Sequence, residues 1–214
     1  MRLALLSGLF AVVAYAQPAL ENEWARVVRV TVDGGHKTAP HDHKMNRVMI
    51  YLDPGKQITR SGDGKSTEFA WKAGDALWSP ASGTHTAEIT AAKPVTIIEV
   101  ELKKPANAPE KVTGSLDPVK LDPAHYHVQF ENRQVRVLHV RIGPGESAPL
   151  HQHSLPRLVV YLTPQDIEVT SPEGKTERVT KPAREIAWAG QARHSERNVG
   201  SGAFEVVVVE MKSR

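Results

Sequence analysis

The sequence predicts an all-β protein built from two similar barrels or sandwiches in tandem. Short β-branched runs separated by turn residues recur along the chain, and the second half repeats the first at a nearly constant spacing. We find no stretch with a convincing helical period. With 214 residues, 40% hydrophobic and 24% charged, the chain has ordinary globular composition and enough material for a buried core.

Residues 1–16 have the pattern of a signal peptide. Arg2 provides a positive start, residues 3–13 form an apolar run, and Ala14-Tyr15-Ala16 resembles a cleavage site. The apolar run is too short for a membrane-spanning helix of about 20 residues, and a buried N-terminal helix or strand is the alternative. We therefore expect an exported protein, periplasmic or secreted, with no membrane association after cleavage.

Cysteine and charge exclude several classes of protein. The chain has no cysteine, so it forms no disulfide, carries no lipid-anchored cysteine and uses no thiolate as a nucleophile or metal ligand. The net charge is +3, with no dense Lys/Arg run and no basic face interleaved with aromatic residues. We therefore expect no nucleic-acid partner.

The internal repeat defines the domain organisation. Four residues of the first half return 110 positions later, from 41 to 151 for example: Gly35, His41, His43 and Arg47 match Gly145, His151, His153 and Arg157. After a one-residue deletion the shift becomes 109 positions, which pairs His85 with His194. We predict an N-terminal domain at 21–104 and a C-terminal domain at 125–213. Segment 105–124, which is rich in proline, is expected to be the linker.

Each half contains short strands bounded by turns. The expected strands are Val27–Val32, Val48–Leu52 and Val95–Leu102 in the first half, and Val135–Ile142, Leu158–Leu162 and Phe204–Met211 in the second. Turns are expected at Pro54-Gly55, Gly62-Asp63-Gly64 and Glu173-Gly174-Lys175. The last strand of each half is almost continuously apolar, which is typical of a strand buried on both faces.

Each half also carries three histidines that can meet at one point. Side chains two residues apart in a strand share a face, so the two imidazoles of each His-X-His pair can reach the same place. His85 and His194 follow a tryptophan and a glycine-containing turn. Three neutral imidazoles suit Zn, Fe, Cu, Ni or Co and leave positions open for water or substrate. The alternative is that these histidines only form hydrogen bonds within the core.

These motifs resemble those of the cupin superfamily, and the duplication resembles a bicupin. Gly-X5-His-X-His-X3 occurs in both halves, and Pro-X-X-Gly-X-His completes it at Pro80–His85. The resemblance implies two tandem jelly-roll barrels, also called double-stranded β-helices, each with a metal pocket. It implies six metal ligands: His41, His43, His85, His151, His153 and His194. Asn198 matches the asparagine that commonly closes the second motif, whereas Ile89 replaces it in the first half.

Two arginines depart from the family pattern and are the candidate catalytic residues. Arg47 and Arg157 stand where many metal-binding cupins have a ligating glutamate, and a guanidinium stays protonated and cannot bind a metal. Each arginine can hold an anionic group such as a substrate carboxylate. The alternatives are that it turns away, or that it pairs with a nearby acid, Glu88 in the first half or Glu196 in the second.

The resemblance implies a metal-dependent function. Three-His sites without the glutamate are similar to those of several iron-dependent dioxygenases, so we expect a dioxygenase-like enzyme acting on a small organic acid or phenolic compound. Iron is the favoured divalent metal, and zinc, manganese, copper or nickel are alternatives. A manganese decarboxylase would be expected to keep the glutamate. The alternative function is a non-catalytic periplasmic protein that binds a metal or small ligand, and a homo-oligomer remains open.

The remaining aromatic and histidine candidates are assigned structural roles. We expect Trp78 and Trp188 to line the barrels, with substrate stacking as the alternative role. Tyr51 and Tyr161 share a strand face with the arginines and are expected to pack in the core, with a phenol donated to the pocket as the alternative role. His125 and His127 form a further His-X-His pair, which we interpret as strand or interface residues.

Overall fold

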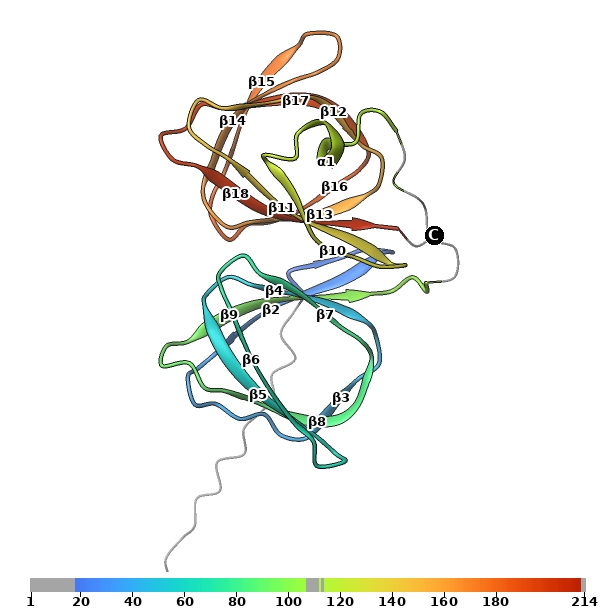
Figure 1. Ribbon diagram of the computed structural model, residues 1–214, viewed down its shortest axis with the longest axis vertical. Helices are drawn as coiled ribbons and strands as arrows, with labels where there is room; N and C mark the ends of the chain where they lie inside the picture. The colour runs from blue at the N-terminus through green and yellow to red at the C-terminus, as the bar shows by residue number, and fades with distance from the viewer. Residues whose placement is uncertain (1–17, 107–111, 113, 213–214) are drawn as a thin grey trace, which may run out of the picture.

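The computed structural model describes residues 18–106, 112 and 114–212. The predicted signal peptide and part of the predicted linker lie outside these residues. The described chain forms two β-barrels, one from each half of the sequence (Figure 1). Among the residues described, no helix has the length and apolarity needed to cross a bilayer.

The N-terminal barrel consists of two antiparallel sheets. The five-stranded sheet contains, in spatial order, β1 (Leu20–Glu21), β2 (Ala25–Val32), β9 (Val95–Leu102), β4 (Arg47–Tyr51) and β7 (Ala76–Ser79). The four-stranded sheet contains β3 (His41–His43), β8 (Ser82–Ile89), β5 (Gly55–Ser61) and β6 (Ser66–Trp71). Strands adjacent in space are often distant in the sequence, as in a jelly roll.

The C-terminal barrel repeats this topology strand for strand. Its five-stranded sheet contains β10 (Tyr126–Glu131), β11 (Val135–Ile142), β18 (Phe204–Met211), β13 (Arg157–Tyr161) and β16 (Ile186–Ala189). Its four-stranded sheet contains β12 (Ser147–His153), β17 (Ala192–Asn198), β14 (Gln165–Thr170) and β15 (Thr176–Lys181). The duplication seen in the sequence is therefore a duplication of the fold, and β10, which is longer than β1, is one difference between the halves.

The predicted strands agree with the observed strands to within two residues. The closing strands β9 and β18 have the predicted bounds, and so does β11. The turn at Pro54-Gly55 lies slightly earlier than predicted, because Gly55 already begins β5. A side chain on Gly55 would lie 2.5 Å from the ring of Trp71, which explains the glycine.

One short helix was not predicted. α1 (Pro118–Leu121) forms a single turn within the predicted linker. Asp117 caps it by accepting a hydrogen bond from the Val119 backbone, and Pro118 stands in the first turn, where a missing N–H costs nothing. A single turn is too short to leave a period in the sequence.

The two five-stranded sheets pack against each other between the barrels (Figure 1). One continuous cluster of buried side chains joins both halves, with Val48, Ile50 and Val100 from the first and Leu158 and Val209 from the second. Each of these sheets faces its own barrel interior on one side and the other barrel on the opposite side. This arrangement explains why β9 and β18 are apolar on both faces.

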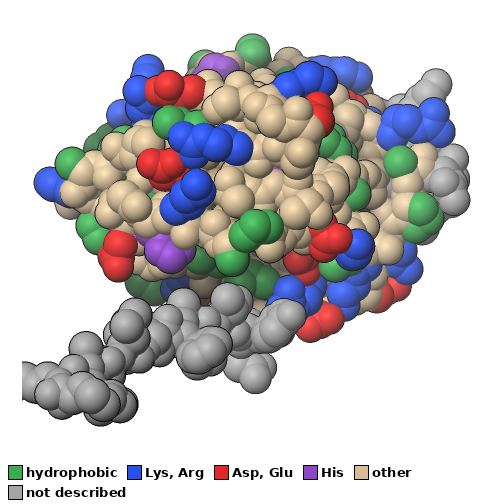
Figure 2. Space-filling model, turned by 90° about the horizontal axis from the view of Figure 1, so that it is seen from below, with side chains coloured by type: hydrophobic (Ala, Val, Ile, Leu, Met, Phe, Trp, Pro, Cys, Tyr) green, Lys and Arg blue, Asp and Glu red, His purple; other side chains and the backbone are tan. Residues whose placement is uncertain are grey.

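Charged side chains of both signs are scattered over the surface (Figure 2). On the face shown in Figure 2, Lys and Arg side chains are interspersed with Asp and Glu side chains. Arg184 of the C-terminal half crosses to the N-terminal half, where it donates a hydrogen bond of 2.6 Å to Asp53. Polar contacts therefore supplement the apolar contact between the barrels.

Candidate metal centres

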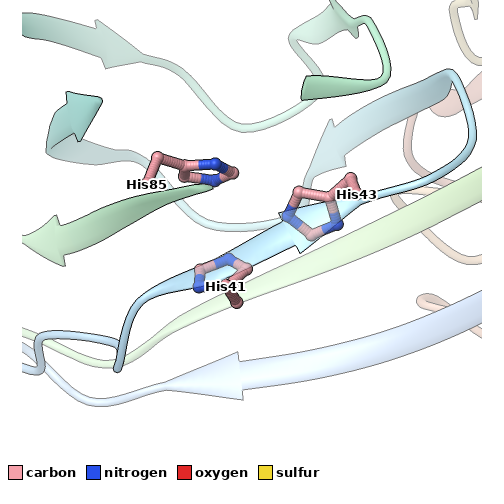
Figure 3. A group of neighbouring side chains, drawn as sticks. All are labelled: His41, His43 and His85. Atoms are coloured by element: carbon pink, nitrogen blue, oxygen red, sulfur yellow. The ribbon is translucent and has the colours of Figure 1, made fainter. Parts of the chain in front are cut away.

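The N-terminal triad is assembled by two paired strands. His41 and His43 extend from β3, and His85 extends from β8 at the position opposite His41 (Figure 3). One nitrogen of each imidazole lies within 4.8 Å of the corresponding nitrogens of the other two. The structure thus brings together all three residues of this predicted triad.

The C-terminal triad has the same construction and deeper burial. His151 and His153 extend from β12, and His194 of β17 lies opposite His151. Their nitrogens also lie within 4.8 Å of one another. His151 and His153 are only 1% and 4% exposed, whereas the N-terminal histidines are half-buried.

Backbone carbonyls orient several of these imidazoles. Nδ1 of His41 lies 2.8 Å from the carbonyl oxygen of Ala39, and Nδ1 of His151 lies 2.8 Å from that of Pro149. A carbonyl only accepts, so Nδ1 carries the hydrogen and the Nε2 lone pair stays free. Metal-binding histidines are held in this way in proteins, and both triads fit a divalent transition metal.

Burial keeps the imidazoles of His43, His153 and His194 neutral. It lowers the pKa of His43 to about 4, and the neighbouring charge of Arg47 acts in the same direction. Burial lowers the pKa of His194 to about 3, helped by His151 and His153. Neutral imidazoles retain the lone pair that a metal needs, so this electrostatic environment favours metal binding over protonation near pH 7.

A buried carboxylate supports the C-terminal triad, and the sequence analysis missed it. Nδ1 of His153 donates a hydrogen bond of 3.3 Å to Glu210, which is completely buried. Glu210 also accepts a hydrogen bond of 2.6 Å from Arg136, which in turn binds Asp117. Burial lowers the pKa of His153 to about 4 although Glu210 opposes the shift.

Tyr126 is a second residue that the sequence analysis missed. Its hydroxyl donates a hydrogen bond of 2.5 Å to Glu196 and lies 3.3 Å from Nε2 of His151. Burial raises the pKa of this phenol, and the charge of Glu196 raises it further. The repeat could not reveal Tyr126, because the corresponding position, 16, falls in the predicted signal peptide.

Arg47 borders the N-terminal triad and is held by two partners. It donates hydrogen bonds of 2.8 Å to Glu99 and 2.9 Å to Ser79. Its Nε is buried and has no partner among the described residues. Only 6% of the side chain is exposed, so the guanidinium has a fixed orientation.

The alternative in which Arg47 pairs with Glu88 and Arg157 with Glu196 is not observed. Arg157 donates to the carbonyl oxygen of Gly190. Glu196 accepts from Tyr126, and Glu88 pairs with Arg60 at 2.7 Å. Glu88 of β8 lies opposite Ile58 of β5, and Arg60 is two residues further along β5.

Cavities of very different size lie beside the two triads, lined by His85 in the first barrel and by His153 and His194 in the second. The N-terminal cavity has a volume of about 800 Å³, and its lining includes Arg47, Tyr51, Phe69, Trp78 and His85. The C-terminal cavity measures about 200 Å³, and its lining includes Tyr126, His153, Arg157, Tyr161, His194 and Glu196. Pockets for small molecules usually measure about 300–1,000 Å³, so only the N-terminal cavity falls in that range.

The remaining candidates have structural positions. Trp188 packs against the cluster shared by the two barrels, as does Trp78 in addition to lining the cavity. His127 lies on β10 opposite His139. His125 hydrogen-bonds Asp122 at 2.7 Å and Glu146 at 3.3 Å instead of joining a triad.

Comparison with known proteins supports the fold. No protein-family model matches the sequence, and no curated protein sequence matches it. AerE from Microcystis aeruginosa is 13% identical, with a TM-score of 0.63 and 87% of each chain covered. Oxalate decarboxylase from Bacillus subtilis is 12% identical, with a TM-score of 0.61, over 90% of this chain and 70% of that one.

A smaller structure matches part of the chain. A cupin domain from Bordetella pertussis is 26% identical over 41% of this chain and 92% of its own, with a TM-score of 0.39. The arrangement of the sheets, the duplicated topology and the two structures that match along most of the chain agree with one another. The chain has the fold of the cupin superfamily, with two jelly-roll barrels in tandem.

Proposed function

We propose that the protein is an exported, metal-dependent oxidoreductase of the dioxygenase type, whose N-terminal barrel takes a small organic acid or phenolic compound. The observation that carries this proposal is the three-His cluster of His41, His43 and His85 beside an 800 Å³ cavity. A catalytic metal needs open positions as well as protein ligands, and a cavity of this size leaves room for a substrate at such positions.

The three histidines would hold a divalent transition metal. When bound there, the metal would act as a Lewis acid and, if it is iron, would supply redox chemistry with O₂. Three neutral nitrogen ligands are compatible with iron, which we favour, and with zinc, copper or nickel. The B. subtilis oxalate decarboxylase has Mn(II) centres, so manganese is a further candidate for this chain.

Arg47 would position an acidic substrate. Glu99 and Ser79 hold its two terminal nitrogens, while its buried Nε lacks a partner among the described residues. An unpaired buried donor costs about 1–3 kcal/mol, so a carboxylate that reached it would recover part of this cost. Apolar and aromatic side chains such as Met49 and Phe69 line the same cavity and would contact the rest of the substrate.

The experiment combines metal analysis with oxygen uptake. The full chain is purified from the compartment to which it is exported, its metal content is measured, and O₂ consumption is followed with a panel of phenolic and dicarboxylic acids. We expect a redox metal and O₂ uptake with at least one acid. His43→Ala should abolish the uptake, whereas the matched variant His153→Ala, in the other barrel, should retain more of it.

Arg47→Lys tests the position of the acid group. It should raise KM more than it lowers kcat, because lysine keeps the charge but loses the fixed planar geometry of the guanidinium. A correctly folded protein without any metal would exclude the metalloenzyme proposal.

A non-catalytic binding protein is the second candidate. The observation that favours it is the closed C-terminal site, where a cavity of about 200 Å³ leaves little room beside His153 and His194. Zinc in both triads, together with no O₂ uptake on any acid in the panel, would support this function over the first.

A further inference from the structure

Tyr126 lies directly beside the C-terminal triad and lines its cavity. It extends from β10 into the barrel and is only 2% exposed. Its hydroxyl oxygen lies 3.3 Å from Nε2 of His151 and 2.5 Å from Oε1 of Glu196. Tyr126 and Glu196 line the same cavity as His153, His194 and Arg157.

The hydroxyl of Tyr126 faces two hydrogen-bond acceptors but has only one hydrogen to donate. The carbonyl of Pro149 holds the hydrogen of His151 on Nδ1, so Nε2 faces the phenol as an acceptor. The carboxylate of Glu196 is also an acceptor, and the phenol has a single hydrogen to donate. That hydrogen goes to Glu196, so lone pairs of Tyr126 and His151 face each other. A cation between them would remove this mismatch.

The distance between these two atoms fits a shared metal ion. Neighbouring ligands bound to one metal at about 2.0–2.1 Å lie about 2.8–3.0 Å apart in octahedral geometry and about 3.3–3.4 Å apart in tetrahedral geometry. The separation of 3.3 Å between the Tyr126 oxygen and His151 Nε2 falls in the tetrahedral range. Ligand nitrogens of His151, His153 and His194 lie within 4.8 Å of one another, and His153 and His194 line the same cavity as Tyr126.

We propose that Tyr126 is the fourth protein ligand of a metal ion held by His151, His153 and His194. When the metal binds, the O–H bond of the phenol breaks, an oxygen–metal bond forms, and Oε1 of Glu196 accepts the proton. This inference rests on the metal binding proposed above. It makes the C-terminal centre a closed site with three nitrogens and one oxygen, of the kind that holds a metal for structure or storage.

The N-terminal barrel does not reproduce this arrangement in its described residues. The repeat places Ala87 at the position of Glu196, so no carboxylate stands there to accept a proton. Tyr51 lies on a different strand, β4, and stacks on Trp71. The two centres would therefore differ in function, with an open N-terminal site and a closed C-terminal one.

Visible absorption of the copper-loaded protein tests the proposal. The full chain is stripped of metal with a chelator and titrated with Cu²⁺ to two equivalents, and metal content is measured by elemental analysis. A phenolate bound to Cu²⁺ gives a strong ligand-to-metal charge-transfer band, which imidazole ligands alone do not give. We expect this band in the wild type and its loss in Tyr126→Phe.

Tyr161→Phe is the matched control. Tyr161 lines the same cavity, but no hydrogen bond joins it to the triad, so this variant should keep the band. Tyr126→Phe retains the aromatic ring, and its far-UV circular dichroism should match that of the wild type. Its C-terminal site should bind Cu²⁺ about 10-fold more weakly or worse.

The outcomes separate this proposal from the function on which it rests. Two bound Cu²⁺ ions without the band, or a band that persists in Tyr126→Phe, would overturn the fourth ligand and leave metal binding intact. Loss of the band in Tyr161→Phe but not in Tyr126→Phe would also overturn it. Failure of His151→Ala to reduce copper binding would refute metal binding at this triad itself.

Discussion

Glu210 holds the imidazole of His153 through a buried hydrogen bond of 3.3 Å, while its other oxygen is bound to Arg136. A carboxylate behind a metal-binding histidine orients the ring and makes its nitrogen a better donor to the metal. The counterpart in the repeat, Glu101, keeps the matching ion pair, with Arg26 at 2.9 Å, but among the described residues it forms no hydrogen bond with His43. The two triads therefore have different support, although their histidines match.

Glu210→Gln should weaken metal binding at the C-terminal triad about 10- to 100-fold. Glutamine keeps the shape of the side chain but loses the charge that polarises His153, and Arg136 keeps its contact with Asp117. The measurement is competition for Zn²⁺ with a chromophoric chelator. Glu101→Gln is the control and should leave both affinities near their wild-type values. Equal effects of the two substitutions would contradict this role.

Leu158→Ala should destabilise both barrels. Leu158 is completely buried in the cluster that joins the two five-stranded sheets, and such a truncation costs about 2–5 kcal/mol. Trp188 is the only tryptophan of the second half, so in a Trp188→Phe background fluorescence reports on the N-terminal half alone. Urea denaturation of the Trp188→Phe protein should still show that Leu158→Ala lowers the stability of the N-terminal half. Leu77→Ala, at a position that is 39% exposed, should change stability far less.

Arg184 combines an unfavourable backbone with a contact across the barrels. Its φ angle of 67° lies in the left-handed region, and its side chain binds Asp53. Arg184→Gly and Arg184→Ala both remove the ion pair, but only glycine adopts this backbone without strain. Thermal denaturation should show Arg184→Gly to be about 1 kcal/mol more stable than Arg184→Ala. Equal stability of the two variants would refute backbone strain at this position.

The fold and both triads could be predicted because they depend on patterns that the duplication records twice. Alternating β-branched residues indicated the strands. The constant spacing of the repeat, for example from His41 to His151, indicated that the two histidine sites correspond. Glu210 also repeats, as Glu101, but the repeat does not show which side chain it contacts. That depends on how far His153 is buried, which is a property of the assembled barrel.

Residues that belong to only one half could not be predicted in this way. Tyr126 has no counterpart within the described residues, and Glu196 and Glu99 correspond to Ala87 and Val208. Glu88 and Glu196, which the sequence offered as alternative partners of the arginines, bind Arg60 and Tyr126 instead. Glu99 lies opposite Met49 in the neighbouring strand, within reach of Arg47, and sequence spacing cannot show that pairing.

The metal-free protein should begin to lose stability at a higher pH than it would if only its carboxylates bound protons on unfolding. A histidine in an unfolded chain has a pKa near 6.5, whereas burial lowers the pKa of His153 to about 4 and that of His194 to about 3. Between these values the unfolded state binds protons that the folded state does not, so stability falls as the pH falls. His125 acts differently: burial is the largest single influence and opposes its protonation, but the hydrogen bonds and charges of Asp122 and Glu146 together outweigh burial and raise its pKa. Its contribution is complete below pH 6.5 and is lost at higher pH.

Urea denaturation of the chelator-treated protein at pH 7.5, 6.5, 5.8 and 5.0 should therefore show a loss of a few kcal/mol below pH 6.5. His194→Asn removes one of the groups responsible, so its stability should depend less steeply on pH over this interval. His36→Asn is the control, because His36 lies in an exposed turn and should leave the slope unchanged. Stability that stays constant from pH 6.5 to 5.0 would mean that the triad imidazoles accept protons in the folded state, and their neutrality as metal ligands would then have to come from the metal itself.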